Sequence, residues 1–464
     1  MNILEIQRIE SRLAIKIKSE RKLSWVNICG SYGIGMIIYQ VKPGDSIYKI
    51  AAHYKVAPER IIADNGLREP GKLSVGQSLV IIPPRKTYRV RAGDTIYDIA
   101  NRNRISVGDL WRMNPELGGR TEVDPGQVLT VSLPTPLGGD LSVTGYAYEN
   151  ISPGVLLKTL PYLTYLAIHS YGLDNSGKLI GMDDEKLIET ARSYGVAPLM
   201  MLSNINENGN FSQSAVNRLL ESDGAQSNLI EEVGSVLEEK RYYGVELDFE
   251  FIEDDNAGAY ADFIDKLKKV LGDVRISVQL EPKTDGQSRG ILYDGHDYES
   301  VGKVVDAVML QTYEWGYAYG EPMPPAPIEK IIQVLDFAKS NIPRGKIYVG
   351  MPTFGFDWAL PYVEGKSRGA FVSDATAPEL AYEKNAEIKY DRELEAPYFG
   401  YYDKTGRGPV EHIVWFGDAE SDRSRLDKIG DYALPGIGVW TVMNYSPALW
   451  SVLRSMYGIK KVLE

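Results

Sequence analysis

Cysteine and histidine are scarce in this chain of 464 residues. The single cysteine, Cys29, excludes an intramolecular disulfide bond. The four histidines lie far apart in the sequence and lack the spacing of a metal-binding motif: His53, His169, His296 and His412. We therefore expect no metal ion and no other cofactor, and we interpret the histidines as structural or surface residues.

Positive charge is also in the minority. The chain has 51 lysine and arginine residues against 63 aspartate and glutamate residues, which gives a formal net charge of -12. Because nucleic acids are polyanions, this balance argues against them as partners. No apolar run is long enough to span a membrane. The hydrophobic fraction of 44% and the charged fraction of 25% are typical of a soluble globular protein.

Residues 1–36 differ in character from the rest of the chain. Basic residues are followed by WVNICGSYGIGMII, which only partly matches a signal peptide. Glycines and Asn27 interrupt its apolar segment, and no small-residue cleavage site follows. We expect this segment to be a disordered extension, or one that the natural protein lacks, with Met36 as the natural start.

An internal repeat covers residues 37–84 and 86–134. The first copy opens with YQVKPGDSIYKIAAHYKV and closes with LSVGQSLVIIP, and the second opens with YRVRAGDTIYDIANRNRI and closes with VDPGQVLTVSLP. Each copy predicts the order strand, helix, helix, strand. Ser46 and Thr95 are predicted N-caps, because their hydroxyl groups can accept unpaired N–H groups of a helix. Asn65 and Asn114 fall where the second helix of each copy is expected to end.

These two units resemble LysM modules. The resemblance rests on the shared GDS/T-I-Y-x-I-A segment, the asparagine before the loop and the Gly-Gln pair before the last strand. It implies binding to glycans that contain N-acetylglucosamine, such as peptidoglycan or chitin, with two copies adding avidity. The alternative is a pair of small βααβ units without a ligand.

Residues 140–464 alternate between predicted strands and helices. After a Pro- and Gly-rich linker at residues 134–139, apolar strands such as LSVTGYAYEN, VAPLMMLSN and VRISVQLEPK are separated by helical segments such as AGAYADFIDKLKKVLG. This alternation favours an α/β fold with a closed parallel (β/α)8 TIM barrel. A small α+β insertion is expected at about residues 357–431, between strands 7 and 8, with a hairpin that turns near Thr405 and Gly406.

The segment YYGVELDFE, residues 242–250, predicts a buried strand that ends in carboxylates. Because side chains of a strand alternate between its faces, Glu246, Asp248 and Glu250 share one face. Three neighbouring acids can hold one carboxyl group protonated at neutral pH while another stays ionised. The alternative is a solvated edge strand of alternating polarity.

This segment resembles the DGxDxDxE signature of family 18 glycoside hydrolases, the chitinase-like enzymes. Gly244, Asp248 and Glu250 match, and Glu246 stands where the family usually has aspartate or asparagine. The resemblance covers about two thirds of the chain and implies a (β/α)8 barrel.

Three downstream segments extend the resemblance. VDAVMLQTYEWG is similar to the family's sixth strand, in which Tyr313 and Glu314 match and Gln311 replaces the usual methionine. KIYVGMPTFGFDW is similar to the seventh strand, and GIGVWTVMNYSP, which contains Trp440, to the eighth.

The resemblance also implies roles. Glu250 would be the general acid and then the base that activates water, in a mechanism in which the substrate's acetamido group is the nucleophile. Asp248 would orient that group, and Tyr313 would donate a hydrogen bond to its carbonyl oxygen. The remaining candidates are substrate-binding residues: Glu246, Trp440, Gln311, Tyr146 and Glu314. For three of these an ordinary structural role stays open, since Trp440 and Tyr146 can be core residues and Gln311 a buried polar residue.

Tandem LysM units before such a barrel resemble bacterial spore-germination hydrolases of the cortical-fragment lytic type. This implies an N-acetylglucosaminidase of spore-cortex peptidoglycan, located in the coat and cortex region of the spore, without an obligate protein partner. A LysM-containing chitinase is the first alternative, and the absence of an evident signal peptide argues against a secreted enzyme of that kind. A non-catalytic glycan-binding protein is the second, and the presence of Glu250 argues against it.

Overall fold

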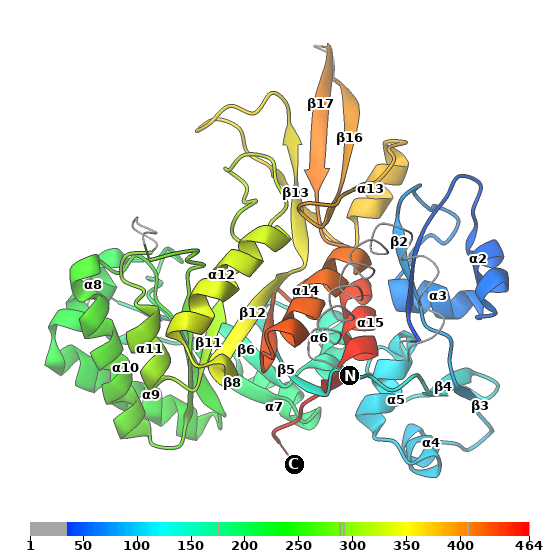
Figure 1. Ribbon diagram of the computed structural model, residues 1–464. Helices are drawn as coiled ribbons and strands as arrows, with labels where there is room; N and C mark the ends of the chain where they lie inside the picture. Colours follow the sequence, from blue (N-terminus) through cyan, green and yellow to red (C-terminus); the bar gives the residue numbers. More distant parts are fainter. Residues whose placement is uncertain (1–34, 175, 287–289, 291–292, 406–407, 464) are drawn as a thin grey trace, which may run out of the picture.

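The computed structural model describes residues 35–174, 176–286, 290, 293–405 and 408–463. The predicted N-terminal extension therefore lies outside the described residues, except for its last two positions. Within the described residues the chain forms two small modules, a barrel and a sheet inserted into the barrel (Figure 1).

Each module has the predicted order of strand, helix, helix, strand, and its two strands pair antiparallel. The first contains β1 (Ile37–Gln40), α2 (Ile47–Tyr54), α3 (Pro58–Asn65) and β2 (Ser78–Ile81). The second contains β3 (Lys86–Arg89), α4 (Ile96–Asn103), α5 (Val107–Met113), the 3-10 turn η2 (Pro115–Leu117) and β4 (Val128–Ser132).

The helix ends explain why the repeat keeps certain residues. Ser46 caps α2 and Thr95 caps α4, as predicted. The Asn65 side chain accepts a hydrogen bond from Val80 N and donates one to Val80 O, both at 2.7 Å. Asn114 makes the same pair of bonds to the backbone of Thr130. These asparagines fasten the second helix to the closing strand, because their amide groups pair like those of a neighbouring strand.

Eight parallel strands form a closed barrel in the described part of the chain, and the fold class predicted from the sequence is confirmed. Each strand pairs with the next, and β5 closes the ring by pairing with both β18 and β6. The strands are β5 (Asp140–Tyr148), β6 (Tyr165–Leu173), β8 (Ala197–Ser203), β9 (Gly244–Asp248), β10 (Arg275–Leu280), β11 (Ala307–Leu310), β12 (Ile347–Pro352) and β18 (Gly436–Trp440). Two short strands extend the sheet: β7 (Leu179–Ile180) beside β6 and β19 (Gly458–Ile459) beside β5.

Helices cover the outside of the barrel and bury its main apolar core. They are α6 (Pro153–Thr159), α7 (Glu185–Ser193), α8 (Gln213–Glu221), α9 (Asp223–Glu239), α10 (Ala257–Leu271), α11 (Tyr298–Val304), α12 (Ile328–Asn341), α14 (Ala419–Asp431) and α15 (Pro447–Met456), with 3-10 turns η3 (Leu160–Tyr162), η4 (Asp254–Asn256) and η5 (Arg344–Lys346). The barrel interior holds a second, smaller apolar cluster together with buried serine, glutamine and acidic side chains.

The insertion follows strand β12 and stands above the barrel in Figure 1. Its sheet has the order β14-β13-β17-β16-β15, and α13 (Ala377–Glu383) accompanies it. The strands are β13 (Phe354–Ala359), β14 (Ala370–Ser373), β15 (Lys389–Asp391), β16 (Ala396–Thr405) and β17 (Gly408–Trp415).

The bounds of the insertion differ from the expected 357–431. Its first strand begins at Phe354, and α14 is a barrel helix beside α12 and α15. The segment expected as one seventh strand is β12 followed at once by β13. Nothing in an apolar run of this kind marks where a strand leaves one sheet and joins another.

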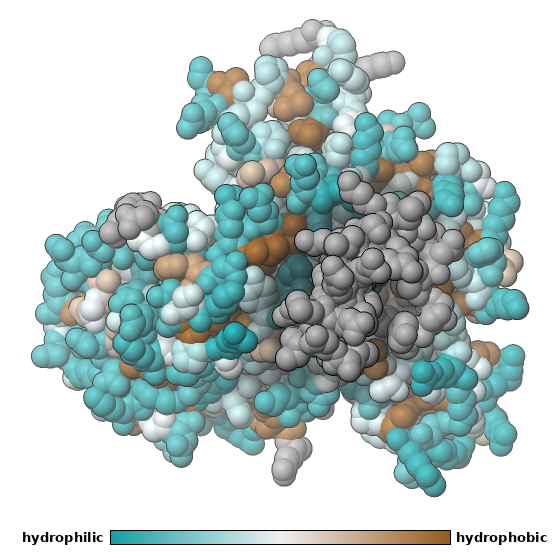
Figure 2. All heavy atoms as spheres, in the orientation of Figure 1, coloured by the Kyte–Doolittle hydropathy of each residue, from teal (hydrophilic) through white to brown (hydrophobic). Residues whose placement is uncertain are grey.

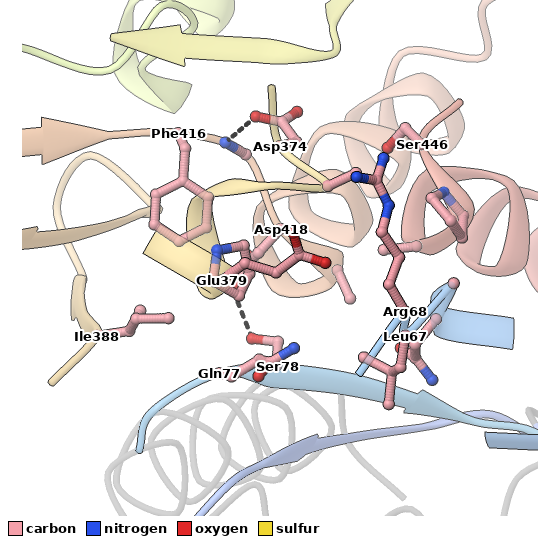
Figure 3. A pocket seen from close by; sticks show the side chains of 18 of the residues that line it. Leu67, Arg68, Gln77, Ser78, Asp374, Glu379, Ile388, Phe416, Asp418 and Ser446 are labelled. Carbon is pink, nitrogen blue, oxygen red and sulfur yellow. Dashed lines mark hydrogen bonds between the residues drawn. The ribbon is translucent and has the colours of Figure 1, made fainter. Parts of the chain in front are cut away.

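The first module is packed against the insertion and the barrel. Ser74 Oγ donates a hydrogen bond to Pro378 O at 2.8 Å, and Ile388 N donates to Val75 O at 2.9 Å. At Gly76, where φ is 85°, a Cβ atom would lie 1.9 Å from Ile388 O, so only glycine allows this approach. A small cavity of about 60 Å³ lies at this joint. Ser78 is hydrogen-bonded to Asp418 across it (Figure 3).

A buried ionic network joins both modules to the barrel. Asp64 of α3 pairs with Arg60, with 2.6 Å between the charged groups, and with Arg454 of α15. Ser451 of α15 donates a hydrogen bond to the backbone oxygen of Asp64 at 2.8 Å. Arg60 also donates to the backbone oxygen of Met113 in the second module. One carboxylate therefore holds three parts of the molecule at a single point.

On the face shown in Figure 2, most residues are hydrophilic and the hydrophobic ones gather in small patches. Among the described helices, none is long and apolar enough to cross a membrane.

Substitution of Asp64 by asparagine tests the joint. Asp64→Asn keeps the side-chain shape but leaves two buried arginines without their counter-charge, so we expect a loss of about 3–5 kcal/mol in the free energy of unfolding. The free energy of unfolding is measured by urea denaturation, monitored by circular dichroism. Glu69→Gln is the control, because its pair with Lys72 is exposed to solvent and should change the free energy of unfolding little. Equal effects of the two substitutions would contradict this prediction.

Candidate active site

A cleft of about 520 Å³ opens at the carboxyl ends of the barrel strands. Six of the eight residues singled out from the sequence line it: Asp248, Glu250, Gln311, Tyr313, Glu314 and Trp440. They come from β9, β11 and β18 or from the residues that follow these strands. This is the end of a barrel at which active sites are built.

The other two predicted residues lie beneath the cleft. Glu246 is 2% exposed, inside the barrel, and accepts hydrogen bonds from Tyr146 Oη at 2.5 Å and from Ser277 Oγ at 3.0 Å. Burial raises the pKa of the Glu246 carboxyl, whereas these two hydrogen bonds lower it. Tyr146, 1% exposed, stands under Trp440 with 5.6 Å between the ring centroids. The structure thus gives Glu246 and Tyr146 contact with other site residues but no surface in the cleft.

Asp248 ends strand β9 on the same face as Glu246. It accepts hydrogen bonds from Ser203 Oγ and from Gln311 Nε2, each at 3.3 Å. Gln311 is itself held by Gln279, since its Nε2 also donates to Gln279 Oε1 at 2.9 Å. Burial, and then the negative charges of nearby glutamates, raise the pKa of Asp248 to about 7. This carboxyl group can therefore exchange a proton near neutral pH.

Glu250 lies two residues beyond Asp248 and is half-buried in the cleft. Burial raises the pKa of its carboxyl group to about 9, and the charges of Asp248 and Glu314 add to the effect. The group therefore carries a proton at neutral pH, as a general acid must. This agrees with the expectation from the sequence that one of the neighbouring carboxyl groups can stay protonated at neutral pH.

Aromatic rings form one side of the site. Tyr313 and Trp440 are parallel, with 6.2 Å between centroids and 3° between ring planes. Tyr313 is buried, whereas Trp440 is half-exposed and borders the cleft. His169 and Tyr148 lie next to Trp440, at 5.7 and 6.2 Å. An apolar wall of this kind suits the flat face of a sugar ring.

Comparison with known proteins identifies the family. The model for glycosyl hydrolases family 18 matches residues 143–444, and the LysM domain model matches residues 39–81 and 88–132. The chain belongs to family 18 of the glycoside hydrolases. It is therefore a glycosidase, and it carries two LysM domains in front of its catalytic barrel.

Relatives of this family 18 hydrolase align with it almost from end to end. The cortical fragment-lytic enzyme of Bacillus anthracis is 32% identical, over 91% of this chain and 99% of its own. The cortical fragment-lytic enzyme of Bacillus subtilis is 31% identical, over 92% and 99%. The crystal structure of the Bacillus cereus spore cortex-lytic enzyme SleL has a TM-score of 0.77 and 32% identity, over 92% of this chain and 99% of its own.

Three polar residues of this family 18 hydrolase that line the cleft or lie beside its acids are not among the predicted site residues. His169 was interpreted as a structural or surface residue, but it lines the cleft, and burial lowers its pKa to about 4, which keeps the ring neutral. Asn204 and Glu281 are buried at the ends of β8 and β10. The position of Asn204 and Glu281 indicates them, because each is a polar residue at the carboxyl end of a predicted barrel strand.

The remaining described histidines lie outside the cleft. His296 is buried, accepts a hydrogen bond from Glu281 N at 3.1 Å and bonds Phe249 O at 3.0 Å, so it joins the ends of two strands. His412 pairs with Asp357 in the insertion at 2.8 Å. Across the described ranges, no group of three or more histidine, cysteine or acidic side chains could hold a metal ion.

The raised pKa of Glu250 predicts a pH-dependent stability. Below its ordinary value of 4.5 the carboxyl is protonated in both states. From there up to about 9 only the unfolded chain releases the proton, so stability falls as pH rises. Glu250→Gln removes this titration and should melt at a higher temperature than wild type at about pH 8, with the difference vanishing near pH 4. Thermal unfolding across pH checks this, and a difference independent of pH would contradict it.

Replacement of Glu246 by aspartate should change the pH–rate profile. The shorter side chain draws the carboxylate away from Tyr146 and Ser277, which lower its pKa, so its charge is more easily lost. The negative charge at position 246 raises the pKa of Asp248, so its loss lowers that pKa. The part of the pH–rate profile that reports the ionisation of Asp248 should then move to lower pH. Glu246→Gln is the control and should move that part of the profile in the same direction. An unchanged profile in Glu246→Asp would refute the expectation.

Proposed function

We propose that this chain is an N-acetylglucosaminidase that hydrolyses spore-cortex peptidoglycan during germination. The observation that carries the proposal is the similarity to cortical fragment-lytic enzymes over 91% of this chain and 99% of theirs, LysM domains and barrel included. The cleft supports it chemically, because a protonated carboxyl and a second acid of intermediate pKa lie together in it.

In the proposed mechanism the substrate supplies its own nucleophile. Glu250 gives its proton to the glycosidic oxygen as the bond from that oxygen to the anomeric carbon breaks. The acetamido oxygen of the N-acetylglucosamine unit attacks that carbon, and a cyclic oxazolinium intermediate forms. Glu250, now ionised, takes a proton from water as the water attacks the same carbon. The acetamido oxygen then leaves, and the product keeps the original configuration.

The neighbouring residues support this acetamido chemistry. Asp248 accepts a hydrogen bond from the acetamido N–H and stabilises the positive charge of the intermediate. Tyr313 donates a hydrogen bond to the acetamido carbonyl oxygen, and Trp440 lies under the sugar ring. Because Asp248 must gain and lose a share of a proton, the nearby acids titrate as a unit.

The other predicted residues act around this centre. Gln311 fixes Asp248 through its amide, and Glu314 binds a sugar hydroxyl group at the cleft wall. Glu246 and Tyr146 are positioning residues beneath the cleft. Glu246 acts on Asp248 through its charge, and Tyr146 bonds Glu246 and supports the ring of Trp440.

We also propose that the LysM domains anchor the enzyme to the glycan, which locates it in the spore. The two domains present equivalent tyrosines to solvent, Tyr48 at 73% and Tyr97 at 61% exposure, and such rings can stack on sugars.

The chitinase of Chromobacterium violaceum has the same fold, with a TM-score of 0.62 at 21% identity, over 68% of this chain and 98% of its own. That likeness concerns the fold alone and does not favour chitin.

The test compares wild type with Glu250→Gln on purified spore-cortex peptidoglycan and on chitin oligosaccharides. We expect new N-acetylglucosamine reducing ends from cortex, identified by mass spectrometry, and a loss of about a thousandfold or more in the variant, because the proton donor is gone. Cleavage of chitin alone would make the enzyme a chitinase. Binding without cleavage of either would make it a glycan-binding protein.

A further inference from the structure

The Glu250 carboxyl group has no hydrogen-bonding partner among the described side chains and backbone atoms, although its position decides whether it reaches the leaving oxygen. Its backbone, in contrast, is held at both polar atoms. Glu250 N donates to Asn204 Oδ1 at 2.9 Å, and Asn204 Nδ2 donates to Glu250 O at 2.9 Å. One amide side chain thus holds both backbone polar groups of the acid.

The backbone needs this support, because the chain turns sharply after Glu250. Phe251 has φ 59°, in the left-handed region, which is unfavourable for residues other than glycine. A conformation of this kind persists only where neighbouring groups hold it. The two bonds from Asn204 lie directly before the turn.

Asn204 also connects the acid to the wall of the cleft. It is fully buried at the end of β8, and its Nδ2 donates a second hydrogen bond, to Ser212 O at 3.2 Å. Ser212 N donates to Asn204 O at 2.7 Å, which closes the loop of residues 204–212. Phe211 of this loop lines the cleft and contacts Phe251, with 6.1 Å between the rings.

We propose that Asn204 is a positioning residue for catalysis, which holds the backbone of the acid Glu250 and ties it to the cleft wall formed by residues 205–211. The inference rests on the proposed function, since it takes Glu250 as the proton donor. An asparagine fits this task because one side chain offers both a donor and an acceptor in a fixed plane. A displacement of about 1 Å of a catalytic group costs on the order of a hundredfold in rate.

The leaving group distinguishes positioning from plain stabilisation. A sugar leaving group needs the proton of Glu250, whereas a nitrophenyl leaving group departs with little protonation. We expect Asn204→Ala to lower kcat about ten- to a hundredfold on cortex glycan, to change KM less than about twofold, and to affect a nitrophenyl glycoside much less. Glu250→Gln should show the same dependence on the leaving group, more strongly.

Thr164→Val is the matched control. Thr164 is also fully buried and bonds two backbone groups, Val143 N at 2.9 Å and Lys460 O at 2.7 Å, but at the opposite end of the barrel. Thr164→Val should lower the melting temperature, and any change in its kcat should be the same for both leaving groups.

If Asn204→Ala does not fold, Asn204→Asp replaces it, since the aspartate keeps the acceptor and loses the donor. Equal losses on both substrates in the Asn204 variant would overturn the inference.

Hydrogen–deuterium exchange gives a second measurement that does not need activity. The Glu250 amide should exchange at least tenfold faster in the Asn204 variant than in wild type, and at the wild-type rate in Thr164→Val. Unchanged exchange in the Asn204 variant would overturn the inference. If wild type cleaves neither cortex glycan nor the nitrophenyl glycoside, the proposed function fails, and exchange still decides whether Asn204 holds the backbone of Glu250.

Discussion

Closure of the barrel between β5 and β6 is the constraint on which the site depends. In an open sheet, one face of β9 would meet solvent or a layer of helices. In a closed ring that face points to an interior filled by side chains, so Glu246 and Asp248 are taken out of water. The raised pKa values of the acids follow from this burial more than from their mutual repulsion, since burial is the larger cause for each.

Such burial is unfavourable for folding and useful for chemistry. A protein selected for stability alone would fill the ring with apolar residues, and this protein places Ala167, Leu199 and Met201 there. The polar side chains beside them are tolerated because they bond one another: Tyr146 and Ser277 to Glu246, and Gln311 to Asp248. The molecule thus combines an ordinary apolar core outside the ring with a hydrogen-bonded polar layer inside it.

Much of this architecture could be predicted from the sequence, for definite reasons. The two modules carry repeated local signals, and alternation along residues 242–250 assigns Glu246, Asp248 and Glu250 to one face whatever the tertiary structure. The unpredicted features depend on pairs that are distant in sequence. Asp64 and Arg454 meet only because α3 packs on α15, and Asn204 reaches Glu250 only because β8 and β9 are neighbours. A single sequence has no record of such pairs.

The joint around Asp64 also affects how the enzyme can meet an insoluble substrate. If a flexible linker joined the LysM domains to the barrel, the cleft could reach any glycan within the length of that linker. Here the LysM domains are packed against the barrel that carries the cleft. An enzyme bound through these domains therefore reaches glycan only at a fixed distance from the point where they bind. Once the LysM domains are bound, binding of glycan in the cleft is favoured where neighbouring strands of the polymer match that offset, and is excluded elsewhere. The spacing and order of the polymer itself thereby become part of what the enzyme recognises.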